Sequence, residues 1–104
     1  MALSRERALT SVGEGWSKII NHLYDELPKG AVVTDVKEKF GTLRFYVSNC
    51  GEAYLQLVDA AEDYSSEVCE FCGEDGCVRE DLSWIKTLCD NCYNNHIAYL
   101  EINE

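Results

Sequence analysis

Apolar residues recur at intervals of three and four over the first 27 residues, a spacing typical of one face of an amphipathic helix. Gly13 and Gly15 would weaken the middle of this helix, which gives Glu14 as an alternative start. Pro28 and Gly30 end it, because proline cannot continue the helical hydrogen-bond ladder. We expect Trp16 to anchor a core. The apolar face comprises Leu9, Val12, Trp16, Ile19, Ile20, Leu23 and Leu27.

Two strands are predicted next. Residues 31–39 are rich in β-branched side chains, which favours a strand. A Phe-Gly pair offers a bend, and residues 42–47 alternate apolar and polar side chains as a returning strand does. The first helix is the natural partner for the apolar side of this hairpin. That side includes Leu43, Phe45 and Val47.

Residues 52–68 have a second helical pattern with an unusually acidic outer face. Acidic residues gather on one side, and the helix leads directly into the first cysteine pair. The side predicted to face the core comprises Ala53, Leu57, Ala60, Ala61, Tyr64 and Val68.

The strongest chemical signal is a pair of C-x2-C motifs, Cys69–Cys72 and Cys89–Cys92, with sixteen residues between them. Each two-residue spacer lets a pair of thiolates grip one ion through a tight turn, and a loop of about 15–20 residues brings the pairs together. Gly73 suits the sharp turn after the first pair. We therefore predict one structural zinc ion at Cys69, Cys72, Cys89 and Cys92. A short hairpin over residues 77–86 and a last helix from about Asp90 to Leu100, with Tyr93, Ile97 and Leu100 facing inward, would complete a treble-clef or zinc-ribbon-like unit.

The sequence gives less support to other roles for these cysteines. Disulfides need an oxidising compartment, and the charged start of the chain lacks an apolar export segment. A thioredoxin-type motif would stand alone after a strand, whereas iron–sulfur ligation stays open. We expect Cys50 and Cys77 to be ordinary buried thiols, with Cys77 and His96 as reserve ligands. A chain of this start, with no long apolar run, is expected in the cytoplasm and not in a membrane.

Composition adds a charge asymmetry. The chain has 104 residues and a net charge of −10. Residues 1–50 hold seven basic and six acidic residues, whereas residues 51–104 hold two and thirteen, so the second half carries all of the net charge. Such an asymmetry marks either an interaction surface or a face that confers solubility.

An enzyme is not expected. Four thiolates leave no open position for a reactive water on the metal. Phosphate-binding loops, the G-x-S-x-G elbow, H-E-x-x-H and the deaminase signature are also missing from the sequence. Nucleic-acid binding by the cysteine-rich half is disfavoured too, because its few basic residues cannot neutralise phosphates.

One segment could still contact nucleic acid. Basic and aromatic residues interleave between Lys37 and Tyr46, and only superficially echo an RNA-recognition motif. A hairpin with a solvated basic face is the preferred interpretation, with Lys37, Lys39, Arg44 and Tyr46 as the alternative nucleic-acid-binding face.

Several segments together resemble a family of small uncharacterised phage and bacterial proteins. The resemblance covers about residues 14–93 and rests on a Gly-Trp helix, the block DVKEKFGTLRFY, and the motifs CEFCG and TLCDNC. It implies a phage or prophage origin, hence the cytoplasm of a bacterial host, and a four-cysteine zinc site at Cys69, Cys72, Cys89 and Cys92.

Together these patterns predict an α+β protein forming one compact domain. Residues 1–50 would form a helix and hairpin, residues 51–68 an acidic helix, and residues 69–104 the zinc-bound part. The favoured function is a non-enzymatic interaction module, a phage accessory protein or inhibitor whose acidic face occupies a basic surface of a host nucleic-acid-handling or defence protein. The candidate partner-binding residues are Glu52, Asp59, Glu62, Asp63, Glu67, Glu70, Glu74 and Asp75.

Overall fold

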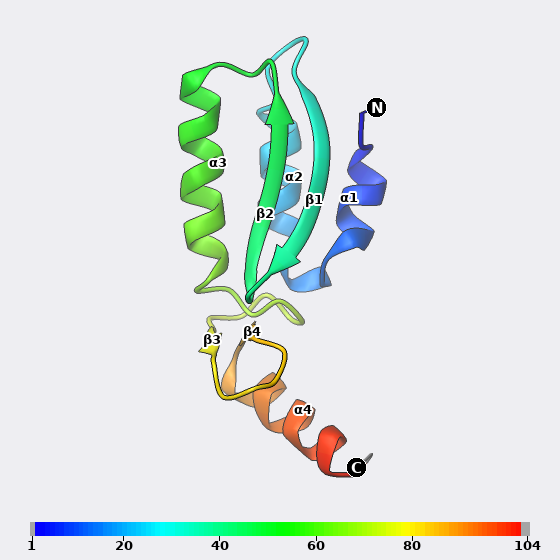
Figure 1. Ribbon diagram of the computed structural model, residues 1–104, viewed down its shortest axis with the longest axis vertical. Coiled ribbons are helices and arrows are strands. Elements are labelled where there is room, and N and C mark those ends of the chain that lie inside the picture. Colours follow the sequence, from blue (N-terminus) through cyan, green and yellow to red (C-terminus); the bar gives the residue numbers. More distant parts are fainter. Residues whose placement is uncertain (1, 103–104) are drawn as a thin grey trace.

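Over residues 2–102, the part described by the computed structural model, the chain forms four α-helices, one 3₁₀ turn and two antiparallel hairpins (Figure 1). The elements are α1 (Arg5–Ser11), η1 (Glu14–Trp16), α2 (Ser17–Asp25), β1 (Val32–Lys39), β2 (Thr42–Ser48), α3 (Glu52–Ser65), β3 (Cys77–Arg79), β4 (Lys86–Leu88) and α4 (Asp90–Ile102). The predicted α+β class and its four-cysteine, zinc-ribbon-like C-terminal unit are confirmed.

The molecule is elongated, with extents of 48 × 23 × 19 Å. In Figure 1 the β1–β2 hairpin is central, with α2 behind it, α3 beside β2 and α1 beside β1. The cysteine-rich part, with β3, β4 and α4, lies beyond the end of the hairpin where β1 turns into β2. No helix in the described part of the chain is long and apolar enough to cross a membrane.

The prediction of one continuous helix over the first 27 residues is wrong, whereas the alternative start at Glu14 coincides with the start of η1, which leads directly into α2. The helix is divided into α1 and α2 by the 3₁₀ turn η1, and Ser4 caps α1 through a hydrogen bond from the Arg7 amide. The cause is close packing: a Cβ atom on Gly15 would lie 1.9 Å from the carbonyl oxygen of Cys69. Glycine here lets the chain approach the first cysteine pair, rather than merely weakening a helix.

The hairpin is built as predicted. Val36 lies opposite Phe45 and Lys37 opposite Arg44, with a β-bulge between Val33 and Asp35. Its inner side packs on α2 and on the preceding turn η1, whose Trp16 is fully buried and donates a hydrogen bond from Nε1 to the carbonyl of Val68 (2.9 Å). The main core comprises Ala8, Trp16, Ile19, Ile20, Leu23, Val33, Val36, Leu43, Phe45, Tyr54, Val58 and Val68.

The core-facing side of α3 differs from the prediction. The helix ends at Ser65 and buries Tyr54, Val58 and Ser65. Of the predicted residues, Leu57, Ala61 and Val68 pack in or against the core, whereas Ala53, Ala60 and Tyr64 are exposed. Two hydrogen bonds hold this side of the helix against the core. The Tyr54 hydroxyl donates to the Leu23 carbonyl (2.5 Å), and the Leu43 amide donates to Ser65 Oγ (2.9 Å). A pattern of apolar residues cannot reveal such polar anchors.

The C-terminal elements also need two corrections. The second strand of the small hairpin is Lys86–Leu88, later than the predicted residues 83–86, because the intervening loop buries Leu82 in a second small core. Helix α4 carries Tyr93 and Ile97 against that core as predicted. Leu100, predicted to face inward, is exposed because α4 extends beyond the residues on which it packs.

Candidate metal centre

Four cysteine sulfur atoms converge where the first cysteine pair meets the start of α4. The Sγ atoms of Cys69, Cys72, Cys89 and Cys92 all lie within 4.8 Å of one another, and those of Cys72 and Cys89 are 3.6 Å apart. Sulfurs around a tetrahedral zinc ion, with bonds of about 2.3 Å, lie about 3.8 Å from each other. Both the distances and the soft donors therefore fit one tetrahedral ion, and the four cysteines could hold a metal.

The first pair sits on a tight turn. The Gly73 amide donates to the Cys69 carbonyl (2.9 Å), and Gly73 adopts a φ of +85°, a conformation that favours glycine. The Cys69 amide donates in turn to the Glu74 carbonyl (2.7 Å). These bonds hold Cys69 fully buried and Cys72 exposed, with their sulfur atoms on the same side.

The second pair spans the junction of β4 and α4. Cys89 follows β4, and Cys92 lies in the first turn of α4. The Cys92 amide points toward Cys89 Sγ (3.4 Å), while the Tyr93 amide donates to the Cys89 carbonyl (2.9 Å). These contacts hold the Cys89 sulfur against the first turn of α4, on which Cys92 lies.

The pKa of the Cys69 thiol is lowered, whereas that of the Cys92 thiol is raised. Burial raises the pKa of Cys69, but hydrogen bonds from backbone groups of Cys89, Cys72 and Phe71 outweigh it and bring the pKa to about 7. Burial and the neighbouring thiols raise the pKa of Cys92 well above its ordinary value. One thiolate thus forms readily, while a full set needs a bound cation to offset the repulsion between them.

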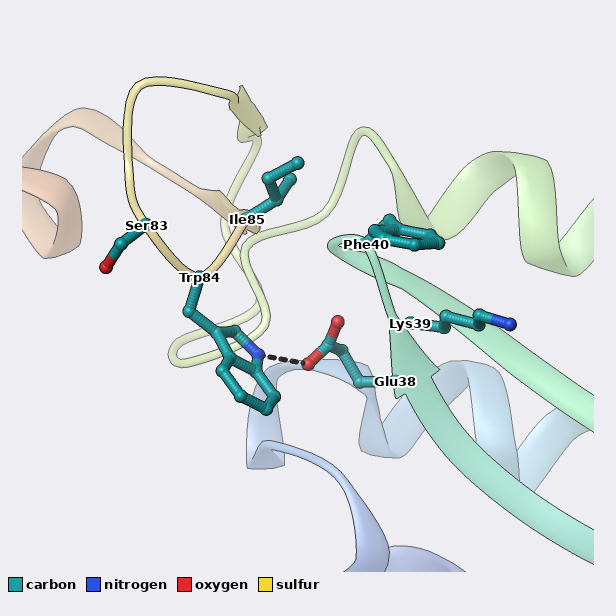
Figure 2. Close-up of a pocket in the computed structure, with 6 residues that line it drawn as sticks. All are labelled: Glu38, Lys39, Phe40, Ser83, Trp84 and Ile85. Carbon is teal, nitrogen blue, oxygen red and sulfur yellow. Dashed lines mark hydrogen bonds between the residues drawn. The ribbon is translucent and has the colours of Figure 1, made fainter.

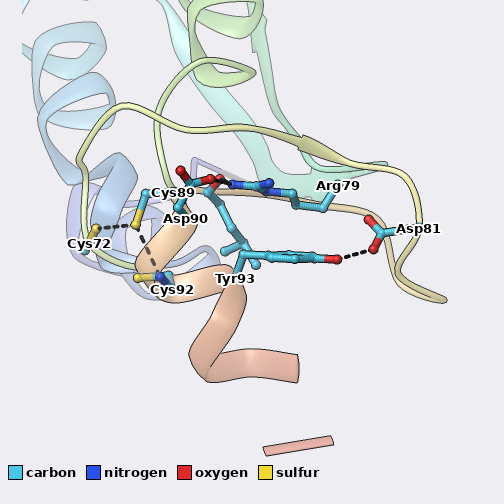
Figure 3. Close-up of polar contacts among 8 residues, drawn as sticks. Cys72, Arg79, Asp81, Cys89, Asp90, Cys92 and Tyr93 are labelled. Atoms are coloured by element: carbon cyan, nitrogen blue, oxygen red, sulfur yellow. Dashed lines mark hydrogen bonds and ion pairs between the residues drawn. The ribbon is translucent and has the colours of Figure 1, made fainter. Parts of the chain in front are cut away.

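An arginine-centred network supports the second pair (Figure 3). Arg79 donates to the Leu88 carbonyl from Nε (3.1 Å) and Nη2 (3.0 Å), and Nη2 also donates to Asp90 Oδ1 (2.8 Å). Its guanidinium lies 4.4 Å from the centre of the Tyr93 ring, and the Tyr93 hydroxyl donates to Asp81. The network joins β3, β4 and α4 around Cys89, a positioning role for Arg79 that the sequence analysis missed.

Glu70 is a correction to the predicted acidic surface. Its side chain is buried, with only 5% of the residue exposed. Oε2 accepts a hydrogen bond from the Gly13 amide (3.3 Å), and Oε1 lies 3.9 Å from Lys86 Nζ without a hydrogen-bond partner. Burial raises the pKa of this carboxyl, and Lys86 opposes the rise. Glu70 therefore connects the first cysteine pair to the N-terminal part and cannot face a partner.

The reserve ligands lie outside the cluster. Cys77 is exposed at the start of β3, which corrects the prediction that it is buried, and Cys50 is half-buried beside the main core. His96 packs edge-on against Phe71, with ring centroids 6.1 Å apart. Neither Cys77 nor His96 belongs to the group of convergent ligand atoms found in residues 2–102.

Most of the predicted acidic residues are exposed. Glu62 is the second exception, because its half-buried Oε2 accepts a hydrogen bond from the Phe45 amide (2.8 Å). Within the described part of the chain, no ion pair involves the exposed ones. These residues, which we call the acidic stripe, are Glu52, Asp59, Asp63, Glu67, Glu74 and Asp75.

The alternative basic residues share the outer side of the hairpin. Lys37 lies directly opposite Arg44, and Lys39 is two residues further along the same strand. Lys37 Nζ is 5.4 Å from the ring centre of Tyr46 and 3.6 Å from an oxygen of Asp35. The four residues named from the sequence therefore come together on one side.

Sequence reasoning missed two exposed aromatic side chains, Phe40 and Trp84, near the junction of the two parts. A phenylalanine before glycine in a two-residue turn, where asparagine is usual, was an available signal for the first. Nothing in the local sequence indicates that Trp84 meets the hairpin.

The site defines a class: an α+β protein with a four-cysteine cluster capable of binding one metal ion in a zinc-ribbon-like unit. Comparison with protein-family models, with curated proteins and with solved structures gives no match to this chain.

Proposed function

We propose that the protein is a non-enzymatic, zinc-stabilised interaction module that uses the acidic stripe to bind a basic surface of another protein. The observation that carries the proposal is the stripe itself: six exposed carboxylates run from the start of α3 into the first cysteine turn. Groups without internal ion pairs keep their full attraction for an external cationic surface.

Spacing along α3 supports a continuous stripe. Glu52, Asp59 and Asp63 are separated by seven and four residues, which places them on one side of a helix. Because the mutual repulsion of aligned carboxylates costs stability, an oppositely charged partner relieves it on binding. Charge attraction also accelerates encounter with basic proteins.

Zinc is the proposed metal, held by Cys69, Cys72, Cys89 and Cys92. When bound, the ion supplies folding free energy by crosslinking the turn after α3 to the start of α4. Because all four donors are cysteines, the proposed role is structural. The zinc tetrathiolate also adds a formal charge of about −2 near Glu74 and Asp75, which reinforces the stripe.

The proposed partner is a host protein that handles nucleic acid or takes part in defence, and the proposed setting is the cytoplasm of a phage-infected bacterium. Such proteins expose basic surfaces because they neutralise phosphates. Occupation of that surface by the acidic stripe would inhibit nucleic-acid binding by competition.

The test uses a partner captured from a bacterial lysate with the tagged, zinc-loaded protein, and then purified. We expect its affinity to fall steeply between about 50 and 500 mM salt. An Asp59→Asn/Asp63→Asn variant should bind several-fold more weakly, while the control Glu6→Gln/Glu26→Gln, with the same net charge, should bind normally. Salt-independent binding, or equal loss in both variants, would contradict the proposal.

A second candidate is binding of single-stranded nucleic acid by the outer side of the hairpin. The favouring observation is the alignment of Lys37, Arg44 and Tyr46, where cations and an aromatic ring share one side. Charge reversal at Lys37 and Arg44 should abolish retention of a fluorescent oligonucleotide. Retention unchanged by that reversal would eliminate this candidate.

A further inference from the structure

A shallow pocket lies between the tip of the β1–β2 hairpin and the loop before β4 (Figure 2). Its volume is about 280 Å³, enough for one long side chain. The pocket lies where the N-terminal part meets the cysteine-rich part, and its lining includes no residue of the metal centre or the acidic stripe. It is lined by Glu38, Lys39, Phe40, Ser83, Trp84 and Ile85.

Phe40 occupies a position that the fold alone does not explain. It has a φ of +54° and Gly41 a φ of +84°, as in a two-residue hairpin turn of type I′, where asparagine or glycine is preferred. A left-handed conformation is strained for phenylalanine, and 65% of the residue is exposed, so burial returns little of that strain. Strained backbone positions cluster at active sites and ligand-binding sites, which makes this turn a candidate for one.

Trp84 is the second exposed ring, with 68% of the residue accessible. Its Nε1–H donates to Glu38 Oε1 (2.9 Å), and the Gly41 amide donates to Glu38 Oε2 (2.9 Å). In Figure 2 the Glu38 carboxylate therefore lies between the two aromatic residues and is fixed there by two donors. The arrangement combines a held negative charge with two accessible rings.

This chemistry selects a cation. The faces of aromatic rings attract ammonium and guanidinium groups, and Lys39 Nζ already lies 5.7 Å from the centre of the Phe40 ring. A carboxylate in the middle of the pocket repels phosphate, which disfavours nucleic acid as the occupant. A planar guanidinium can stack on a ring and reach a carboxylate at the same time.

We propose that this pocket accepts an arginine side chain from the basic partner protein. The proposal rests on the proposed function in taking the partner to be a basic protein, and it deepens it by naming the side chain that would be recognised. The guanidinium stacks against Phe40 or Trp84 and is attracted by Glu38. Lys39 competes with the arginine of the partner, because its ammonium group carries the same charge and already lies over the Phe40 ring.

The test titrates the zinc-loaded 104-residue chain with the peptide acetyl-Arg-Gly-Arg-Gly-Arg-amide, followed by proton–nitrogen NMR. The matched control peptide has citrulline, which is neutral, in place of each arginine. We expect the arginine peptide to shift the indole N–H signal of Trp84 and the amide signal of Gly41. The indole signal of Trp16, fully buried and bonded to Val68, serves as an internal reference.

Variants then separate the contributions. Glu38→Gln, which retains an oxygen acceptor for Trp84, should weaken peptide binding about two- to five-fold, the range expected of an exposed cation–π and carboxylate contact. Its control is Glu80→Gln, an equal loss of charge in the neighbouring exposed loop. Phe40→Leu keeps an apolar side chain without the ring and should lose as much as Glu38→Gln.

Two further variants guard against loss of folding as an explanation. Asparagine is favoured at the left-handed position of this turn. Phe40→Asn should therefore raise the melting temperature while weakening peptide binding. Lys39→Met removes the competing cation and should tighten arginine binding. The same variant would weaken binding of an oligothymidine if the pocket took nucleic acid, so the sign of its effect distinguishes the two occupants.

Selective shifts at Trp84, weakening by Glu38→Gln and Phe40→Leu but not Glu80→Gln, and tightening by Lys39→Met would support the proposal. Equal effects of Glu38→Gln and Glu80→Gln, wild-type binding by Phe40→Leu, or weaker peptide binding by Lys39→Met would overturn it. With the purified partner, loss in Asp59→Asn/Asp63→Asn but not in Glu38→Gln would retain the acidic stripe and reject the pocket. Loss of partner binding in Glu38→Gln but not in Asp59→Asn/Asp63→Asn would retain the pocket and reject the acidic stripe.

Discussion

Substitution of Gly15 by alanine tests how the metal centre is attached to the rest of the protein. A Cβ atom there would lie 1.9 Å from the Cys69 carbonyl oxygen, 2.6 Å from the Gly73 nitrogen and 2.7 Å from the Glu70 carbonyl carbon. All three are backbone atoms, so no side-chain rotation can relieve the overlap. The turn η1 and the first cysteine pair would have to separate by about 1.5 Å to restore ordinary contact.

That separation would break the hydrogen bond from the Gly15 amide to the Glu70 carbonyl, now 2.8 Å long. Loss of a buried hydrogen bond costs about 1–3 kcal/mol and overpacking about 1–3 kcal/mol. The lower entropy of an unfolded chain with alanine offsets about 0.4–1 kcal/mol. We therefore expect Gly15→Ala to lower the free energy of unfolding by about 1–5.5 kcal/mol.

The assay is urea unfolding of the zinc-loaded protein, with zinc affinity measured by competition with a chromophoric chelator. Gly51→Ala is the control, because Gly51 has a φ of +79° but nothing within 4 Å of an added Cβ. It should cost about 1–3 kcal/mol from backbone strain alone, because a φ of +79° with a ψ of 162° is a conformation that essentially only glycine adopts, and it should leave zinc affinity unchanged. If Gly15→Ala costs no more than Gly51→Ala and binds zinc equally well, the close packing does not support the metal centre.

Three further perturbations address the core and the site. Trp16→Phe should cost about 2–4 kcal/mol, measured by urea unfolding, because it removes the hydrogen bond to Val68 and leaves a cavity. Burial raises the pKa of Tyr54 to about 12, so stability should fall as pH rises from about 10 to 12, where the unfolded tyrosine ionises and the folded one does not; Tyr54→Phe should reduce this fall, and Tyr24, whose pKa burial also raises, accounts for part of the remainder. Cys89→Ser should reduce bound zinc and the melting temperature, while Cys77→Ser should leave both unchanged in metal analysis and calorimetry.

The strands and the metal cluster could be predicted because their signals are local. Alternation from Thr42 to Val47 identifies the strand and its buried side. The spacing of the two C-x2-C motifs brings four sulfur atoms together, since each pair fixes its own turn geometry. In both cases the chain's covalent geometry carries most of the information.

The errors arise where distant segments meet. Gly13 and Gly15 look like weak helical positions until the cysteine-rich turn that packs on them is known. Glu70 looks like one more surface acid, but it is buried against the Gly13 amide and Lys86. The periodicity of one segment does not indicate which distant segment packs against it. The packing roles of these glycines and of Glu70 therefore become visible only in the tertiary structure.

The junction between the N-terminal and cysteine-rich parts also connects the metal centre to the pocket at the hairpin tip. The carbonyl of Gly41, at the hairpin tip, accepts a hydrogen bond (2.7 Å) from Oγ1 of Thr87, which lies in β4, the strand that leads into Cys89. Metal binding would therefore order β4 and, through it, the position of Trp84 relative to Glu38. It follows that removal of zinc should abolish the response of the Trp84 indole signal to the arginine peptide, even if the main core around Trp16 stays folded. A structural ion would then serve binding without touching the partner.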